Sequence, residues 1–155
     1  MKQSAGILVF RRTASEIQFF LVHPGGPFFA KRDAGAWTIP KGEIIPPEEP
    51  LETAVREFEE ETGIPLDGPF IPLNAVVQKG GKQVICWAVE ADLNPESVVS
   101  NTFELEWPPR SGKRRSFPEI DKSGWFTLLD AKQLINERQV PLLEQLVERL
   151  EGGPK

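Results

Sequence analysis

One stretch of the sequence, residues 42–64, constrains the chain more than any other. It reads GEIIPPEEPLETAVREFEEETGI and places seven glutamates between Glu48 and Glu61, opposed only by Arg56. On a helix, acidic side chains three and four positions apart repel one another, so this density of like charge is costly in water. We therefore expect a cationic ligand to bind here.

The same stretch has the start and stop signals of an α-helix. Prolines precede it and open it, where a fixed φ and a missing N–H are tolerated. Gly63 followed by Pro65 is a strong termination signal. The prolines at the start are Pro46, Pro47 and Pro50.

The predicted helix has two distinct faces. Glu57, Glu60 and Glu61 fall together on one of them, close enough to share a hard divalent cation such as Mg²⁺ or Mn²⁺. A solvated acidic surface is the alternative interpretation. The face expected to pack on a core consists of Leu51, Val55, Phe58 and Thr62.

The spacing of the fixed positions adds specificity. Gly42, five residues, Glu48, seven residues and then REFEEETGI match the Nudix box at every defined position. The chain therefore resembles the Nudix hydrolases. This resemblance implies an α/β (α+β) fold in which a mixed β-sheet is sandwiched between helices. It also implies metal-assisted hydrolysis of a nucleoside diphosphate linked to another group, with Mg²⁺ or Mn²⁺ as cofactor.

The resemblance also implies roles for individual residues. Glu57, Glu60 and Glu61 would bind metal together with the backbone carbonyl of Gly42. Glu60 is a ligand, a general base or both, and Arg56 orients the glutamates through charge-assisted hydrogen bonds. Glu48 belongs either to the outer metal shell or to the internal hydrogen bonding of the motif. A further catalytic acid is expected before the Trp125 segment, with Glu119 the first candidate and Asp121 the second.

Composition predicts one globular domain. At 155 residues and 39% hydrophobic content, the chain can bury one core, expected over residues 1–151 with a flexible tail at 152–155. The net charge of −5 argues against a membrane or a stable nucleic-acid partner. A single cysteine, Cys86, fits a reducing cytoplasm and a core position. We expect a cytoplasmic monomer or homodimer.

Hydrophobic alternation and turn residues predict the remaining elements. The expected strands are Ser4–Arg11, Ile17–His23, Trp37–Gly42, Phe70–Gln78, Gln83–Ala91 and Trp125–Phe126, and two later helices are expected over Leu129–Glu137 and Pro141–Leu150. Residues 79–82, KGGK, predict a hairpin between two of these strands. Residues 94–118 are expected to form a long irregular loop.

Several side chains outside the box are candidates for binding substrate. Arg110, Arg114 and Arg115 in the long loop would close over phosphates, or else form a solvated charge run. Trp107 would stack a nucleobase, with Trp87 and Phe117 as other aromatic candidates. His23, the only histidine, is either structural at a strand end or a phosphate contact. Lys41 is the remaining candidate, directly before the box.

Only the resemblance to particular branches of the family indicates a substrate class. The Pro40-Lys41-Gly42 entry looks like the polyphosphate-cleaving branches, which favours a dinucleoside polyphosphate such as diadenosine tetraphosphate. Relatives of that branch would have a tyrosine soon after the box, and this chain has none. Position 79 is lysine, where an ADP-ribose hydrolase would have proline. The alternatives are a housekeeping nucleoside triphosphate pyrophosphatase, an RNA 5′-end pyrophosphohydrolase and a non-catalytic Nudix-fold sensor.

Overall fold

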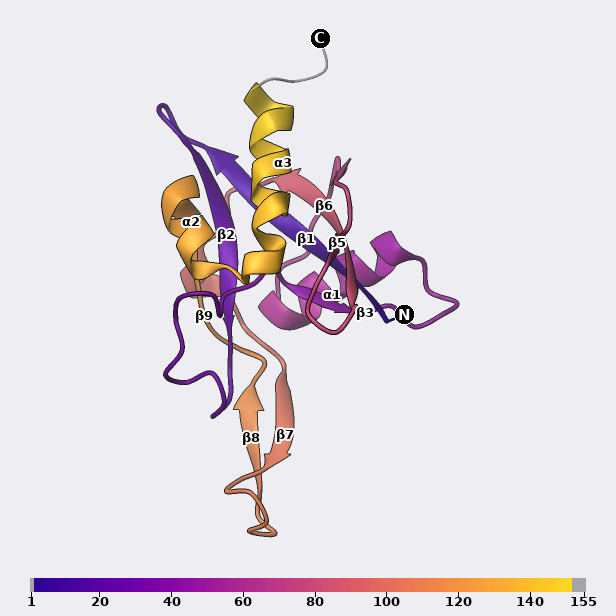
Figure 1. Cartoon of the computed structure of the whole chain (residues 1–155), viewed down its shortest axis with the longest axis vertical. Helices are drawn as coiled ribbons and strands as arrows, with labels where there is room; N and C mark the ends of the chain where they lie inside the picture. Colours follow the sequence, from indigo (N-terminus) through magenta and orange to yellow (C-terminus); the bar gives the residue numbers. More distant parts are fainter. Residues whose placement is uncertain (1, 152–155) are drawn as a thin grey trace.

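A mixed seven-stranded sheet forms the centre of the computed structural model, which describes residues 2–151 (Figure 1). The predicted flexible tail at 152–155 lies outside the described residues. The order along the sheet is β4-β6-β1-β2-β9, with β3 also paired to β1 and β5 also paired to β6. The strands are β1 (Gln3–Arg12), β2 (Ile17–Pro24), β3 (Lys41–Glu43), β4 (Ile71–Pro72), β5 (Val76–Val77), β6 (Gln83–Glu90) and β9 (Ile120–Thr127).

The sheet is mixed because one pairing is parallel. Strands β1 and β6 run parallel over eight residue pairs, from Gln3↔Gln83 to Phe10↔Glu90. The other pairings are antiparallel, including the predicted hairpin of β1 and β2. The expected strand at residues 70–78 is divided into β4 and β5, and both pair with β6.

Helices cover both faces of the sheet. Helix α1 (Pro50–Thr62) packs on one face, and α2 (Leu128–Leu134) and α3 (Val140–Glu151) pack on the other. Alternation along the strands builds the two cores, because successive side chains point to opposite faces. On β1, Ile7 and Val9 face α1, whereas Leu8 and Phe10 face α2 and α3. The predicted fold class, a mixed sheet between helices, is confirmed.

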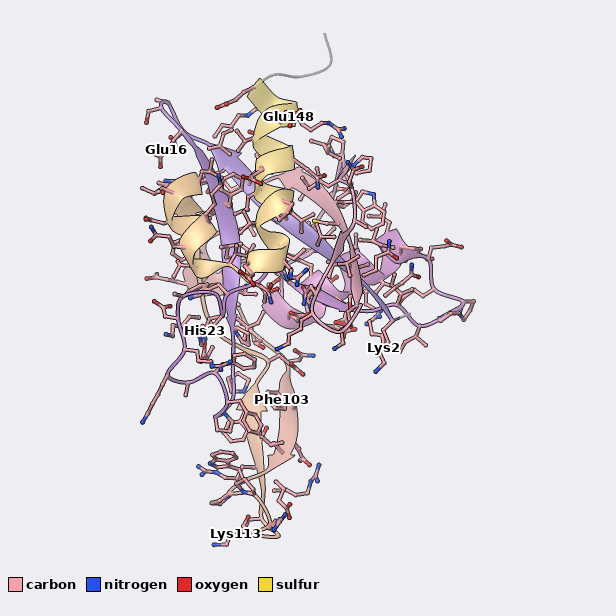
Figure 2. The ribbon with its side chains drawn as sticks, viewed as in Figure 1. Lys2, Glu16, His23, Phe103, Lys113 and Glu148 are labelled. Carbon is pink, nitrogen blue, oxygen red and sulfur yellow. The ribbon has the colours of Figure 1, made fainter. Side chains whose placement is uncertain are left out.

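The prediction of an irregular loop at 94–118 is wrong. The segment contains the short 3-10 helix η1 (Pro95–Ser97) and an antiparallel hairpin of β7 (Thr102–Glu106) and β8 (Arg114–Pro118). Phe103 and Phe117 lie opposite each other, with ring centroids 6.0 Å apart. The hairpin projects from the body of the molecule, and Lys113 lies near its far tip (Figures 1 and 2).

The position of the single cysteine agrees with the sequence interpretation. Cys86 is fully buried, and burial raises the pKa of its thiol to about 12, as a core cysteine requires. Among the helices of residues 2–151, none is long and apolar enough to cross a membrane.

Candidate active site

Helix α1 begins and ends where the sequence signals place it. The Glu52 side chain accepts a hydrogen bond from the backbone N–H of Glu49 at 3.0 Å, which closes the first turn. Gly63 ends the helix in the left-handed region, at φ 77°, and its N–H donates to the Glu59 carbonyl. Phe58 is fully buried against the sheet and anchors the helix that carries the glutamates.

Arg56 organises the acidic face of α1. Its Nε and Nη2 donate to the two carboxylate oxygens of Glu48, both at 2.8 Å. Its Nη1 donates to Glu60 at 2.7 Å and to Glu57 at 3.2 Å. These partners raise the pKa of Arg56 further, with the hydrogen bond to Glu48 as the largest cause. Arg56 therefore orients three glutamates, in the role that the resemblance implied.

Glu48 takes part in hydrogen bonding within the motif. Besides the two bonds from Arg56, it accepts one from the Thr53 hydroxyl at 2.8 Å. These bonds stabilise the ionised form, so they lower the pKa of Glu48 to about 2. Of the two roles left open for Glu48, the structure shows the internal one.

Three carboxyl groups lie together beside this network: Glu57, Glu61 and Glu119, here called the carboxylate cluster. Burial raises the pKa of Glu61 to about 9, and the neighbouring charges of Glu57 and Glu119 add to the effect. Burial, followed by the charge of Glu57, also raises the pKa of Glu119. The structure thus brings the first candidate acid, from the junction of β8 and β9, to the helix that carries the box.

Gly42 approaches the cluster at a distance that excludes a side chain. A Cβ added at this position would lie 2.0 Å from the Glu57 carboxyl carbon and 2.3 Å from its Oε2. Gly42 lies on β3, which pairs with β1 at Ala5. The glycine is required because the backbone passes directly against the Glu57 carboxylate.

The donor set fits a hard divalent cation. The Glu57 carboxylate lies against the Gly42 backbone, and oxygen is the ligand that Mg²⁺ and Mn²⁺ prefer. Without a cation these carboxyl groups disfavour one another's ionised forms, which is the effect seen on Glu61. Within residues 2–151 no three acidic, histidine or cysteine side chains already converge as a complete metal site. Arg56 engages Glu57 and Glu60 instead.

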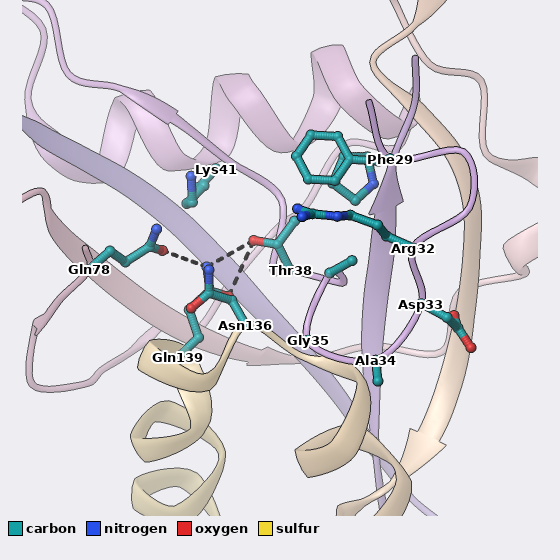
Figure 3. A pocket seen from close by; sticks show the side chains of 12 residues that line it. Phe29, Arg32, Asp33, Ala34, Gly35, Thr38, Lys41, Gln78, Asn136 and Gln139 are labelled. Atoms are coloured by element: carbon teal, nitrogen blue, oxygen red, sulfur yellow. Dashed lines mark hydrogen bonds between the residues drawn. The ribbon is translucent and has the colours of Figure 1, made fainter. Parts of the chain in front are cut away.

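The second feature of the site, besides the carboxylate cluster, is a polar pocket of about 520 Å³, whose lining side chains Figure 3 shows. Lys41 joins the two, because it lines the pocket and directly precedes Gly42. Burial lowers the pKa of Lys41, while the charges of Glu61 and Glu57 act in the opposite direction. The other walls come from the loop after β2 and from the chain around β5 and η2 (Glu137–Gln139), and include Phe29, Arg32, Thr38, Gln78, Asn136 and Gln139.

His23 is buried with both ring nitrogens engaged within the protein, which corrects its assignment as a phosphate contact. Its ring is fully buried, with Nδ1 2.7 Å from Asp121 Oδ1 and Nε2 2.6 Å from the Arg32 carbonyl oxygen. The ring also packs edge-on against Trp37, with centroids 5.5 Å apart. His23 therefore holds the loop after β2 in place. Asp121, the second candidate acid, is engaged with His23.

The basic residues of segment 94–118 are not brought to the carboxylate cluster. Arg114 pairs with Glu104 at 3.2 Å, and Arg115 lies over the Phe117 ring at 5.9 Å. Arg110 lies in the exposed turn between β7 and β8. These residues sit on the hairpin that projects away from α1 (Figure 1). Trp107, also on this hairpin, packs edge-on against Phe28 with centroids 5.4 Å apart.

Gln78 and Gln139 are among the polar residues of the pocket that sequence reasoning missed. Gln139 is 1% exposed, and its side chain reaches Gln78 from a different part of the chain. Neither residue belongs to a motif, and an isolated glutamine in a polar turn gives no signal in a single sequence. Arg32, in the loop after β2, is a further pocket residue that belongs to no motif.

A comparison with protein families finds the model described as NUDIX domain over residues 2–146. Among curated proteins, the mouse bis(5'-nucleosyl)-tetraphosphatase [asymmetrical] is 36% identical over 115 residues, covering 66% of this chain and 74% of that protein. The rat protein of the same name is 37% identical over 100 residues, covering 57% of this chain. That match spans 64% of the rat protein, which is less than two thirds of its length.

Solved structures share the fold over nearly the whole chain. A crystal structure of a C. elegans Ap4A hydrolase binary complex aligns with a TM-score of 0.69 at 23% identity, covering 96% of this chain and 98% of that one. The NUDIX domain of Shewanella oneidensis NrtR complexed with ADP ribose aligns with a TM-score of 0.65 at 18% identity, covering 96% and 87%. At these identities the likeness establishes the architecture.

Proposed function

The chain belongs to the NUDIX domain family, and on that premise we propose that it is a metal-dependent pyrophosphohydrolase that cleaves dinucleoside polyphosphates such as diadenosine tetraphosphate. The observation that carries the chemistry is the carboxylate cluster beside Gly42, with Arg56 ordering the neighbouring glutamates. The similarity to the tetraphosphatases of mouse and rat supports the substrate class. It agrees with the substrate favoured by the Pro-Lys-Gly entry to the box.

The reaction is difficult because the phosphate chain repels nucleophiles and the leaving phosphate carries charge. Glu57 and Glu61, with the Gly42 carbonyl, would hold the divalent cation, and Glu119, whose charge acts on Glu61, would add a third carboxylate. When bound, such a cation neutralises phosphate charge and lowers the pKa of a coordinated water. Glu60 extends from the same helix face and is held by Arg56 at 2.7 Å. It remains the candidate for proton transfer or additional ligation.

The pocket and the cluster together suit an extended substrate. Lys41 stands between them as a cation, so a phosphate chain can run from the carboxylate cluster into the pocket. A pocket of about 520 Å³ is within the usual size of small-molecule sites. Phe29 on its wall offers an aromatic face, which matters in a chain that has no tyrosine.

The proposal is tested with a substrate panel in Mg²⁺ and, separately, Mn²⁺. The panel contains diadenosine tetraphosphate, nucleoside triphosphates, ADP-ribose and 5′-triphosphorylated RNA. We expect asymmetric cleavage of the tetraphosphate with the highest kcat/KM, and loss of turnover with a chelator. A higher kcat/KM for nucleoside triphosphates or RNA would replace the substrate assignment. Absence of turnover on every substrate would favour the non-catalytic sensor.

A further inference from the structure

A chain of hydrogen bonds runs along one wall of the pocket and begins at a buried backbone amide. The Ile39 N–H donates to Oε1 of Gln139 at 3.1 Å. A backbone N–H can only donate, so this contact fixes which end of the Gln139 amide is oxygen. Gln139 is 1% exposed, and the hydrogen bond from the Ile39 backbone holds its side chain in one orientation.

The orientation of Gln139 determines that of Gln78. Nε2 of Gln139 donates to Gln78 Oε1 at 2.7 Å and to the Thr38 hydroxyl at 2.9 Å. Because Oε1 of Gln78 is engaged as an acceptor, its NH₂ group is the end presented to the pocket. Figure 3 shows the Gln78 amide nitrogen turned toward Lys41. The wall at this point consists of two donors, Gln78 Nε2 and Lys41 Nζ, which we call the donor wall.

The donor wall has no acceptor of its own. Within residues 2–151, no side chain accepts from the Gln78 NH₂ group or pairs with the half-buried Lys41 ammonium. Every fully buried side-chain nitrogen and oxygen of the described residues has a hydrogen-bond partner, so these two donors reach solvent at the pocket surface and are free to meet a ligand there. The guanidinium-bearing side chain of Arg32 lines the same pocket and adds positive charge.

We propose that Gln139 is a positioning residue that holds Gln78 as a donor, and that Gln78 and Lys41 together bind phosphate oxygens of the substrate chain beyond the cleaved bond. This inference rests on the proposed function for the identity of the substrate. It assigns the donor wall to the polyphosphate and not to a nucleobase. Charged, acceptor-only oxygens match two neighbouring donors, of which one is a cation, and such bonds are stronger than those to neutral acceptors.

The first test changes the polarity of the wall with little change of shape. Gln78→Glu retains an acceptor for Gln139 and replaces the donor that faces Lys41 with a carboxylate oxygen. We expect KM for diadenosine tetraphosphate to rise about tenfold or more, with kcat changed less than about twofold. The matched control is Gln145→Glu on α3, where Gln145 bonds the Asn74 backbone outside the pocket. Its KM is expected to equal that of the wild type.

A binding measurement separates phosphate from base recognition. Inorganic tripolyphosphate and adenosine are titrated separately into each protein in a calorimeter, at constant ionic strength and with a chelator present. Gln78→Glu is expected to weaken tripolyphosphate binding about tenfold and to leave adenosine binding unchanged. Unchanged tripolyphosphate affinity, or loss of adenosine affinity alone, would overturn the proposal.

A double-mutant cycle tests whether Gln139 acts through Gln78. Gln78→Met, Gln139→Met and the double variant are compared by KM for the tetraphosphate. If Gln139 only positions Gln78, the double variant has the KM of Gln78→Met, whereas independent roles give multiplied effects. If the KM changes of the two single variants multiply in the double variant, Gln139 does not act by positioning Gln78.

Two further measurements apply if Gln139→Met does not fold or if the wild type cleaves no dinucleoside polyphosphate. If Gln139→Met does not fold, NMR spectra of the wild type replace the double-mutant cycle. The side-chain amide resonances of Gln78 are identified as those that disappear in Gln78→Glu. They are expected to shift when tripolyphosphate is added to the wild type, and unmoved resonances would contradict the donor wall. If the wild type cleaves no dinucleoside polyphosphate, the proposed function fails, while the tripolyphosphate titration still decides the role of Gln78.

Discussion

Arg56 holds Glu48 through two parallel hydrogen bonds, Nε to Oε2 and Nη2 to Oε1, each 2.8 Å long. This fork connects the segment before α1 to the middle of the helix. The third nitrogen of the same guanidinium reaches Glu57 and Glu60, so one side chain fixes both the entry to the helix and its acidic face.

Arg56→Lys is expected to lower kcat about tenfold or more while the protein stays folded. An ammonium group carries the charge but cannot form the planar fork, so the glutamates lose their common orientation. The matched control is Arg12→Lys, which breaks the two-nitrogen pair with Glu90 at 3.1 and 2.7 Å on the far end of β1. Steady-state kinetics with matching circular dichroism checks the prediction, and equal kcat values for both variants would contradict it.

Gly42→Ala is expected to reduce kcat about tenfold or more. The added Cβ would lie only 2.0–2.3 Å from side-chain atoms of Glu57 and would therefore displace its carboxylate. Gly124→Ala serves as the control, since the nearest atom to its added Cβ is a Phe126 ring carbon at 3.2 Å. Activity is compared with the melting temperature of each variant. If Gly42→Ala retained wild-type kcat, Glu57 would not need its present position.

Glu61→Gln is expected to lose roughly 100-fold or more in kcat, because it removes a charged ligand from the carboxylate cluster. Glu60→Gln is expected to lose activity to a similar extent if Glu60 transfers a proton or binds metal. Glu59→Gln makes the same chemical change at an exposed position of α1 and should leave turnover intact. Near wild-type kcat for Glu61→Gln at saturating Mg²⁺ would remove it from the site.

Divalent cations are expected to raise the melting temperature, because the crowded carboxyl groups bind them only in the folded state. At about 100 times Kd the gain is roughly 2.7 kcal/mol in the free energy of unfolding. Thermal scans with EDTA, Mg²⁺ and Mn²⁺ measure the shift without reference to activity. The shift should shrink in Glu61→Gln and persist in Glu59→Gln. Superimposable scans of the wild type with and without metal would argue against a cation site.

The stabilising effect of Glu48 is expected to depend on pH. Its folded-state pKa of about 2 lies below the ordinary value of 4.5, so its contribution is present above pH 4.5 and is lost as the pH falls toward 2. Urea midpoints of the wild type and Glu48→Gln should differ most at pH 6 and converge near pH 2–3. A difference that stays constant over this range would mean that the Glu48 charge is not responsible.

The sequence by itself determined the acidic helix and its immediate chemistry. Spacing within one helix needs no tertiary information, because residues three and four positions apart are neighbours on its surface. The interpretation of Arg56 as an organiser of glutamates agrees with the hydrogen bonds observed. Short apolar runs bounded by polar and turn residues likewise indicated β1, β2 and β6, since a strand covered on both faces of the sheet is apolar along most of its length.

Only the tertiary structure decided which distant residues join that helix. His23 became a core residue because Asp121, 98 positions away, meets its ring, and Glu119 reached the cluster because β9 pairs with β2. The β7–β8 hairpin escaped prediction because its strands are only five residues long and neither buries a side chain completely, although β7 alternates polar and apolar residues. Gln139 and Gln78 are 61 residues apart in sequence. Their polarity is set by a backbone amide, because hydrogen-bond direction depends on which groups folding brings together.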